Sequence, residues 1–184
     1  MANKPKDIME MIKAQEIEWV DLRFTDPKGK WQHLTMCSVA VDEDQLADGF
    51  MFDGSSIAGW KAINESDMIL QPDLDAIYID PFSATPMLIL ICDVVEPSTG
   101  QLYARDPRST AKRGEAYLRT LGIGDTVYIG PEAEFFVFDD VRWKLGYNVG
   151  SYELDDIELP TNTGTKYEGG NKGFRPGVTG GYLP

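Results

Sequence analysis

Two glutamates stand two residues apart in the apolar segment GPEAEFFVFDD, residues 130–140. If this segment is a strand, alternation places Glu132 and Glu134 on one face, which Phe136 and Phe138 complete. A strand that is apolar on both faces is normally buried. Two carboxylates whose stems lie roughly 6.6 Å apart repel each other there, and burial makes each charge costly. Proton uptake, a bound cation, or a strand end open to water would each resolve the conflict.

A hard divalent cation would account for both carboxylates, because Mg²⁺ and Mn²⁺ prefer oxygen ligands and often bridge to substrate phosphates. Glu132 and Glu134 could hold two ions, one each, on either side of a phosphate-bearing substrate. The alternative is a strand end where both glutamates reach water. The Glu-x-Glu pattern is common and does not by itself decide between the two.

The loop DGSSIAGW, residues 53–60, is a second place where polar groups gather. Asp53 and Gly54 favour a turn, and Ser55 and Ser56 add hydroxyls. A carboxylate beside hydroxyls could accept a proton or bind a cation, and an ordinary surface turn is the alternative. A third segment, YEGGNKGFRPGVTGG at residues 167–181, could offer backbone amides and two cationic side chains to an anion, although it lacks the phosphate-binding loop pattern.

The elements that position these residues follow from periodicity and turn chemistry. The N-terminal half predicts a small α+β unit, with a helix from about Pro5, a hairpin around DPKG, a short acidic helix at 42–49, a loop at 50–60, and strands at 74–82 and 85–97. The hairpin core is expected to contain Trp19, Leu22, Phe24, Trp31 and Leu34.

The C-terminal half begins with a linker at about 97–106. Asp106 and Pro107 are a good N-cap and first residue for a helix that Gly122 ends. A strand over 125–140 should begin a second sheet, and after Trp143 the pattern is lost in a polar stretch. Such an apolar strand needs neighbours that this sequence does not supply, so we expect the chain to be the N-terminal part of a longer protein. A disordered tail is the alternative.

Composition narrows the classes of function. The net charge of −13 argues against nucleic-acid binding and suits a protein that binds cations. No apolar run approaches the roughly 20 residues of a membrane span, and the N-terminus lacks a signal-peptide core, so a cytoplasmic location is expected. Cys37 and Cys92 are expected to be reduced core residues. A single histidine, His33, excludes the usual kind of zinc site and is expected to be structural.

Three motifs together resemble the N-terminal part of bacterial type I glutamine synthetase. These are FDGSSIAGW, GPEAEFFVFDD and YEGGNKGFRPGVTGGYLP, in this order and at these separations, and the resemblance covers essentially the whole chain. It implies a β-grasp domain, placed at 16–101, followed by the beginning of the catalytic domain, placed at 108–184. It also implies ATP-dependent ligation of ammonia to L-glutamate through γ-glutamyl phosphate, with two divalent cations, Mg²⁺ or Mn²⁺, in each site.

The resemblance assigns roles to particular residues. Glu134 would bind the ion near glutamate and Glu132 the ion near the ATP phosphates. Asp53 would help bind ammonium and remove its proton, Ser56 would contact a flap over the site, and Trp60 would lie near a subunit boundary. The loop would serve the neighbouring subunit's site in a homo-oligomer, a dodecamer of two hexameric rings.

The sequence departs from the family pattern at Phe174, where a histidine is common, and at Thr179, where a lysine is common. The remaining ligands and the nucleotide contacts are expected beyond Pro184, so the chain alone is expected to be inactive. Two other functions stay open, a ligase that joins glutamate to another amine and a non-catalytic cation-binding module. Asp53 disfavours the first, because a residue that binds ammonium serves the ammonia-using enzyme.

Overall fold

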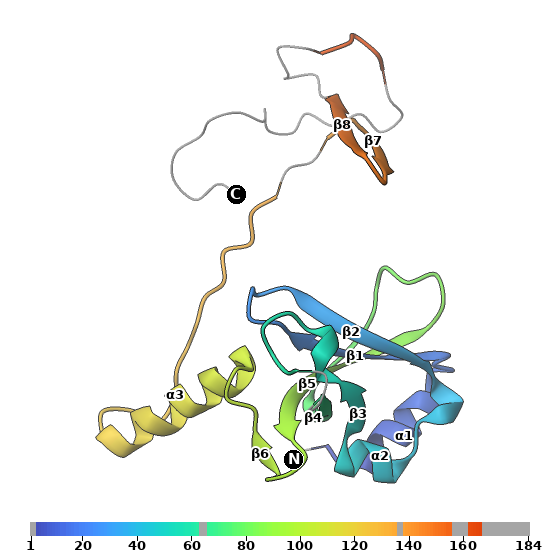
Figure 1. Ribbon diagram of the computed structural model, residues 1–184. Coiled ribbons are helices and arrows are strands. Elements are labelled where there is room, and N and C mark those ends of the chain that lie inside the picture. The colour runs from blue at the N-terminus through green and yellow to red at the C-terminus, as the bar shows by residue number, and fades with distance from the viewer. Residues whose placement is uncertain (1–2, 63–65, 136–137, 156–161, 167–184) are drawn as a thin grey trace. The chain divides into compact units, whose positions relative to one another are not determined.

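The computed structural model describes residues 3–62, 66–135, 138–155 and 162–166 (Figure 1). The chain divides into two units, Met1–Val127 and Tyr128–Pro184. The first unit contains a mixed sheet with helices, which confirms the α+β prediction. No helix among the described residues is both long and apolar enough to cross a membrane.

Helices α1 (Pro5–Ala14) and α2 (Glu43–Asp48) lie side by side next to the sheet (Figure 1). In α1, Ile8 and Ile12 are one turn apart and buried. Helix α2 begins where the Asp42 carboxylate accepts the Gln45 backbone N–H. It ends at Gly49, whose φ of 90° and close contact with β4 leave no room for a Cβ. Both helices therefore form where the sequence predicts them.

The sheet of the first unit has the strand order β2-β1-β5-β4-β3, with β6 paired to β5. Its members are β1 (Trp19–Thr25), β2 (Trp31–Cys37), β3 (Phe50–Asp53), β4 (Asp67–Ile79), β5 (Met87–Glu96) and β6 (Gln101–Leu102). Strand β1 runs parallel to β5, while all other pairs are antiparallel. Alternate residues of β1 and β5 join the helices in one hydrophobic core, which includes Val20, Leu22, Phe24, Leu88, Leu90, Cys92 and Val94.

The hairpin β1–β2 forms as predicted, but only two of its five expected core residues are buried. Leu22 and Phe24 lie in the core, whereas Trp19, Trp31 and Leu34 are 36%, 55% and 39% exposed. Trp19 and Trp31 lie on the face opposite Leu22 and Phe24, because side chains alternate along a strand. Leu34 shares the face of Leu22 but lies on β2, the last strand of the sheet, which has less material to cover it. The same position leaves Cys37 exposed, against expectation, while Cys92 in the central strand β5 is buried as predicted.

Two strand boundaries differ from the sequence prediction. Residues 50–53, expected to be loop, form β3 and pair with the start of β4. Strand β4 itself begins at Asp67, seven residues before the predicted start, and its register with β5 shifts between Pro72 and Ile77. Proline has no N–H to donate to a ladder, so an irregularity beside Pro72 is its usual consequence.

Helix α3 (Pro107–Leu121) follows the predicted linker and ends at Gly122, as expected. Its N-cap, Asp106, is fully buried and accepts the backbone N–H groups of Arg108 and Ser109. Arg108 also pairs with Asp73 of β4 and Asp93 of β5, and Lys112 pairs with Asp93. Helix α3 is therefore fixed to the sheet at its N-terminal end.

The second unit contains a hairpin that the sequence did not predict. Strands β7 (Asp140–Gly146) and β8 (Val149–Asp155) pair antiparallel across a two-residue connection, and all of β8 lies after Trp143, in the stretch predicted to lack a pattern. Trp143 faces Tyr152 across this hairpin, and both rings are largely exposed. Cross-strand aromatic pairs stabilise such ladders, and this pairing is visible only once the register is known.

One buried carboxylate holds the outer face of the β1–β2 hairpin together. The Asp21 side chain is 2% exposed and accepts hydrogen bonds from Thr35 Oγ1, Arg23 Nε at 2.7 Å and His33 Nδ1 at 2.8 Å. Arg23 also reaches Asp80 at 3.5 Å. His33 thus takes part in a structural network, in keeping with its expected role.

This network makes the stability of the first unit pH-dependent. Burial alone would raise the pKa of Asp21, but the hydrogen bonds from Thr35, Arg23 and His33 outweigh it and lower that pKa. A lowered folded-state pKa contributes stability above the unfolded value, about 3.9, and this contribution disappears as the pH falls through the folded value. From pH 5 to pH 3 the wild type should therefore lose more stability than Asp21→Asn in urea titrations. Asp48→Asn, at an exposed site, should behave as the wild type, and equal pH dependence of Asp21→Asn and wild type would contradict the assignment.

Candidate active-site loop and carboxylate pair

The segment that carries Asp53 and Ser56 is a short turn at the end of β3. Asp53 is the last residue of that strand and pairs with Asp67 of β4. A single 3₁₀ turn, Gly54–Ser56, follows it. Gly54 is buried, and a Cβ there would lie 2.5 Å from Met68 Cγ and 3.1 Å from the Ser66 carbonyl oxygen. The glycine is therefore required for the loop to turn directly against β4.

Ser55 holds the Asp53 carboxylate in a local cap. The carboxylate Oδ1 accepts the Ser55 backbone N–H at 2.9 Å and the Ser55 hydroxyl at 2.6 Å. These two hydrogen bonds are the main reason that the pKa of Asp53 is lowered, and the Ser66 side chain adds to the effect. Asp53 is thus ionised at neutral pH, and its low proton affinity suits holding a cation better than acting as a strong base.

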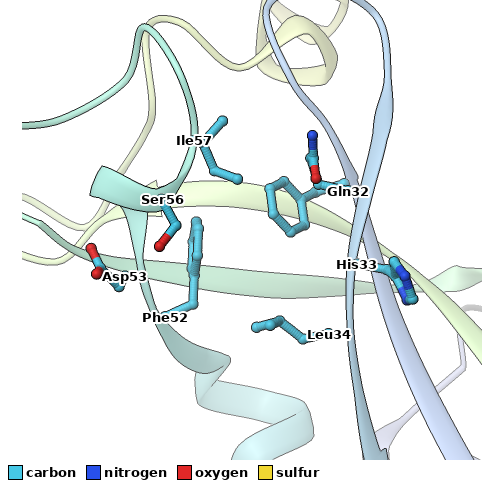
Figure 2. A pocket seen from close by; sticks show the side chains of 8 residues that line it. Gln32, His33, Leu34, Phe52, Asp53, Ser56 and Ile57 are labelled. Atoms are coloured by element: carbon cyan, nitrogen blue, oxygen red, sulfur yellow. The ribbon is translucent and has the colours of Figure 1, made fainter. Parts of the chain in front are cut away.

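A pocket of about 300 Å³ lies between this turn and strand β2. Figure 2 shows Asp53 and Ser56 on one side and Gln32 and Leu34 on the other. The remaining lining residues are Phe24, His33, Phe52 and Ile57. Sequence reasoning missed the part played by β2, because nothing in the sequence says that the hairpin lies beside residues 53–57. The partly exposed Leu34, expected in the core, lines this pocket instead.

An aromatic cluster stands behind the turn. The ring of Trp60 lies 5.5 Å from Phe24, 6.1 Å from Phe52 and 5.5 Å from Tyr103, measured between centroids. Trp60 is buried, and its indole Nε1 makes no hydrogen bond within the described part of the chain. The far end of the loop is therefore held mainly by ring contacts and by its backbone.

Glu132 and Glu134 lie in the second unit, in a segment without regular secondary structure. The predicted strand over 125–140 is thus wrong for residues 125–135, where Phe135 is 77% exposed; Phe136 and Val137 lie outside the described residues. A strand needs hydrogen-bonding neighbours, and none of the described strands pairs with this segment.

One feature of Glu134 disagrees with the alternative hypothesis that both glutamates simply reach water. Glu132 is exposed, but Glu134 is half-buried, and its Oε2 is buried without a hydrogen-bond partner among the described residues. A buried carboxylate oxygen without a partner is costly, and a cation or a proton is the usual remedy. Carboxylate oxygens are the donors that Mg²⁺ and Mn²⁺ prefer, so the two glutamates fit such ions. Within the described residues no group of three or more His, Cys, Asp or Glu side chains that could hold a metal ion occurs.

The third candidate segment, residues 167–181, lies outside the described residues, and with it Lys172, Phe174, Arg175 and Thr179. The described candidate residues are therefore the Asp53 loop with its pocket, in the first unit, and, separately, the glutamate pair in the second unit.

Comparisons with known proteins match this chain to glutamine synthetases. Residues 16–97 match the family model described as "Glutamine synthetase, beta-Grasp domain", and residues 104–182 match "Glutamine synthetase, catalytic domain". Glutamine synthetase of Rhizobium meliloti is 59% identical over 179 residues, and that of Vibrio cholerae is 52% identical over 179 residues. Each alignment covers 97% of this chain and 38% of the relative, so the chain spans well under half the length of these relatives.

A solved structure agrees with the sequence matches. The Plasmodium falciparum glutamine synthetase determined by cryo-electron microscopy has a TM-score of 0.70 with 27% sequence identity, covering 85% of this chain and 30% of that one. The β-grasp fold followed by the start of a catalytic domain, expected from the three motifs, is confirmed.

Proposed function

Since this chain belongs to the glutamine synthetase family, we propose that the whole protein joins ammonia to the side-chain carboxylate of L-glutamate, at the expense of ATP. Two observations carry the proposal together. This one chain matches both family models, and nearly the whole of this chain aligns with a glutamine synthetase at 59% identity. ATP would phosphorylate the glutamate side chain to γ-glutamyl phosphate, and ammonia would displace the phosphate. We place the β-grasp domain at 16–101 and the start of the catalytic domain at 108–184.

Glu132 and Glu134 are proposed to hold Mg²⁺ or Mn²⁺, and the unpartnered Oε2 of Glu134 supports this. When bound, such ions neutralise charge on a transferring phosphoryl group and on its neighbours. The carboxylates themselves fix where that positive charge stands, Glu134 toward the glutamate side and Glu132 toward the ATP phosphates. Their short spacing in the sequence keeps the two ions close enough to act on one substrate.

Asp53 is proposed to bind ammonium. Its ionised carboxylate, capped by Ser55, offers a fixed negative charge at the end of β3. Amines have pKa values of about 8–10, far above that of Asp53, so proton loss from ammonium to this carboxylate alone is uphill. The role that best fits its charge is to hold and orient ammonium, with proton removal completed as the nitrogen attacks. Ser56, beside it in the pocket, is proposed to contact a flap over the site.

The whole protein is further proposed to be a cytoplasmic homo-oligomer, a dodecamer of two hexameric rings. In that arrangement the Asp53 loop would serve the site of a neighbouring subunit. The exposed apolar side chains of residues 127–135, such as Tyr128 at 93% and Ile129 at 83%, support contacts with further protein.

The activity is tested by assaying the whole protein for glutamine formation that requires ATP, a divalent cation and ammonia together. We expect ammonia to be used with a higher kcat/KM than methylamine or polyamines. A preference for another amine would identify a different ligase of the same superfamily. Cation binding without ATP consumption with any amine would identify a non-catalytic module.

A further inference from the structure

The loop that carries Asp53 and Ser56 is fastened at its far end by two residues distant in sequence. Tyr103 donates its hydroxyl to the Trp60 carbonyl at 3.1 Å, and this contact is buried. The Arg105 guanidinium donates to the Gly59 carbonyl at 2.6 Å and to the Trp60 carbonyl at 3.4 Å. Both residues lie between β6 and α3, in the same unit as the loop. Three hydrogen bonds therefore converge on two adjacent carbonyls.

Ring contacts and an ion pair reinforce this attachment. Tyr103 packs edge-on against Trp60, and Trp60 in turn contacts Phe52, the residue before Asp53. Lys61 pairs with Glu96 of β5 at 2.6 Å and lies over the Tyr103 ring. The loop is thus attached at both ends, at Asp53 through the ladder between β3 and β4 and at Trp60 through Tyr103 and Arg105.

The attachment is connected to Asp53 through consecutive turns. The Trp60 N–H donates to the Ile57 carbonyl at 3.1 Å, and the Ile57 N–H donates to the Gly54 carbonyl at 3.2 Å. Gly54 is the residue next to Asp53 and packs so closely beside Ser66 and Met68 that a Cβ there would clash. These hydrogen-bonded turns therefore connect the Trp60 end of the loop to Gly54, the residue next to Asp53, and Ser56 lies between them.

We propose that Arg105 and Tyr103 are positioning residues that act through the Trp60 and Gly59 carbonyls to fix the loop in the geometry that presents Asp53 to ammonium. The expected effect on ammonia kinetics rests on the proposed function. Its structural part, the ordering of residues 54–60, does not depend on the reaction. The physical reason is that displacing a catalytic group by about 1 Å can lower the rate on the order of 10²-fold. The loop that carries the Asp53 carboxylate must therefore keep a fixed position.

The test uses Arg105→Met and Tyr103→Phe in the whole protein. Methionine keeps the aliphatic part of the arginine without its donors, and phenylalanine keeps the ring that packs on Trp60 without its hydroxyl. We expect Arg105→Met to lower kcat/KM for ammonia about tenfold, with KM for ATP and glutamate unchanged. Tyr103→Phe should have a smaller effect in the same direction, since Arg105 still reaches the same carbonyl.

Arg119→Met is the matched control. Arg119 also donates to a backbone carbonyl, that of Asp125, but lies at the other end of α3. It should leave ammonia kinetics unchanged. In an Asp53→Ala background, Arg105→Met should add little, because a residue that acts through Asp53 has no effect once Asp53 is gone. A full tenfold loss in that background would overturn the positioning role.

Amide hydrogen exchange of residues 54–60 separates this inference from the function. Faster exchange in Arg105→Met than in Arg119→Met or wild type supports it, and unchanged exchange overturns it whatever the enzyme does. Faster exchange with unchanged ammonia kinetics in an active enzyme would overturn the link to ammonia. A wild-type protein that makes no glutamine would overturn the proposed function, while the exchange result still decides whether Arg105 orders the loop.

Discussion

Replacing Asp53 by asparagine in the whole protein is expected to lower kcat/KM for ammonia by about 10²–10⁴-fold, with KM for ATP nearly unchanged. Asparagine retains an oxygen for the Ser55 N–H and hydroxyl, so the turn should persist while the charge is lost. The pKa of Asp53 is lowered, so the wild-type carboxylate is ionised throughout the neutral range and its charge is what the substitution removes. Initial rates at varied ammonia and fixed saturating ATP and glutamate measure the effect.

The control for this change is Asp48→Asn, an exposed aspartate at the end of α2, which should leave the kinetics unchanged. Asp53→Glu should recover little, because one further methylene moves the charge out of the Ser55 cap. A loss confined to KM for ATP would place Asp53 elsewhere in the mechanism.

A mixing experiment tests whether the loop serves a neighbouring subunit. Asp53→Ala subunits and Glu134→Ala subunits, each nearly inactive, would be assembled together and the mixed rings confirmed by native mass spectrometry. A shared site lets a wild-type loop meet a wild-type glutamate pair at some interfaces, so a fraction of activity should return. Mixed rings as inactive as either parent would show that Asp53 serves its own subunit or none.

Replacing Glu134 by glutamine should abolish most metal-dependent stabilisation and activity without harming the metal-free fold. Its Oε2 is buried and unpartnered, so removing the negative charge relieves a cost in the metal-free protein. Thermal stability without metal should hold or rise. A ligand at about 100 times its Kd stabilises by about 2.7 kcal/mol, and this contribution is what the substitution should reduce.

Melting temperatures with and without Mn²⁺ measure this effect directly, beside glutamine formation at varied Mn²⁺. Glu153→Gln is the matched control, since its side chain in the same unit is 80% exposed. It should show the wild-type shift in melting temperature. A Glu134→Gln protein with an unchanged metal-dependent shift would show that Glu134 is not a ligand.

Much of the fold follows from local chemistry that the sequence displays. Asp42 and Gly49 bound α2, and Asp106 and Gly122 bound α3, because caps and left-handed glycines act within a few residues. The hairpin around DPKG likewise depends on neighbours along the chain. The family resemblance could also be recognised from the sequence, because it rests on three motifs whose order and separation need no coordinates.

The tertiary structure decided which side chains are buried and which strands are neighbours. Alternation places Trp31 and Leu34 on opposite faces of β2, so only Leu34 could join the core, and the edge position of β2 leaves even Leu34 partly exposed. The segment with Glu132 and Glu134 has strand character in its sequence, yet a strand forms only where another strand supplies hydrogen bonds.

The sequence by itself determined the residue types that can do chemistry, the ends of the helices and the family. Only the tertiary structure brought β2 beside the Asp53 turn, placed Tyr103 and Arg105 on the Trp60 and Gly59 carbonyls, and buried one oxygen of Glu134. The physical reason is range. Caps and turns are satisfied within a few residues, whereas the contact between Arg105 and Gly59 joins residues 46 apart, and no local pattern records it.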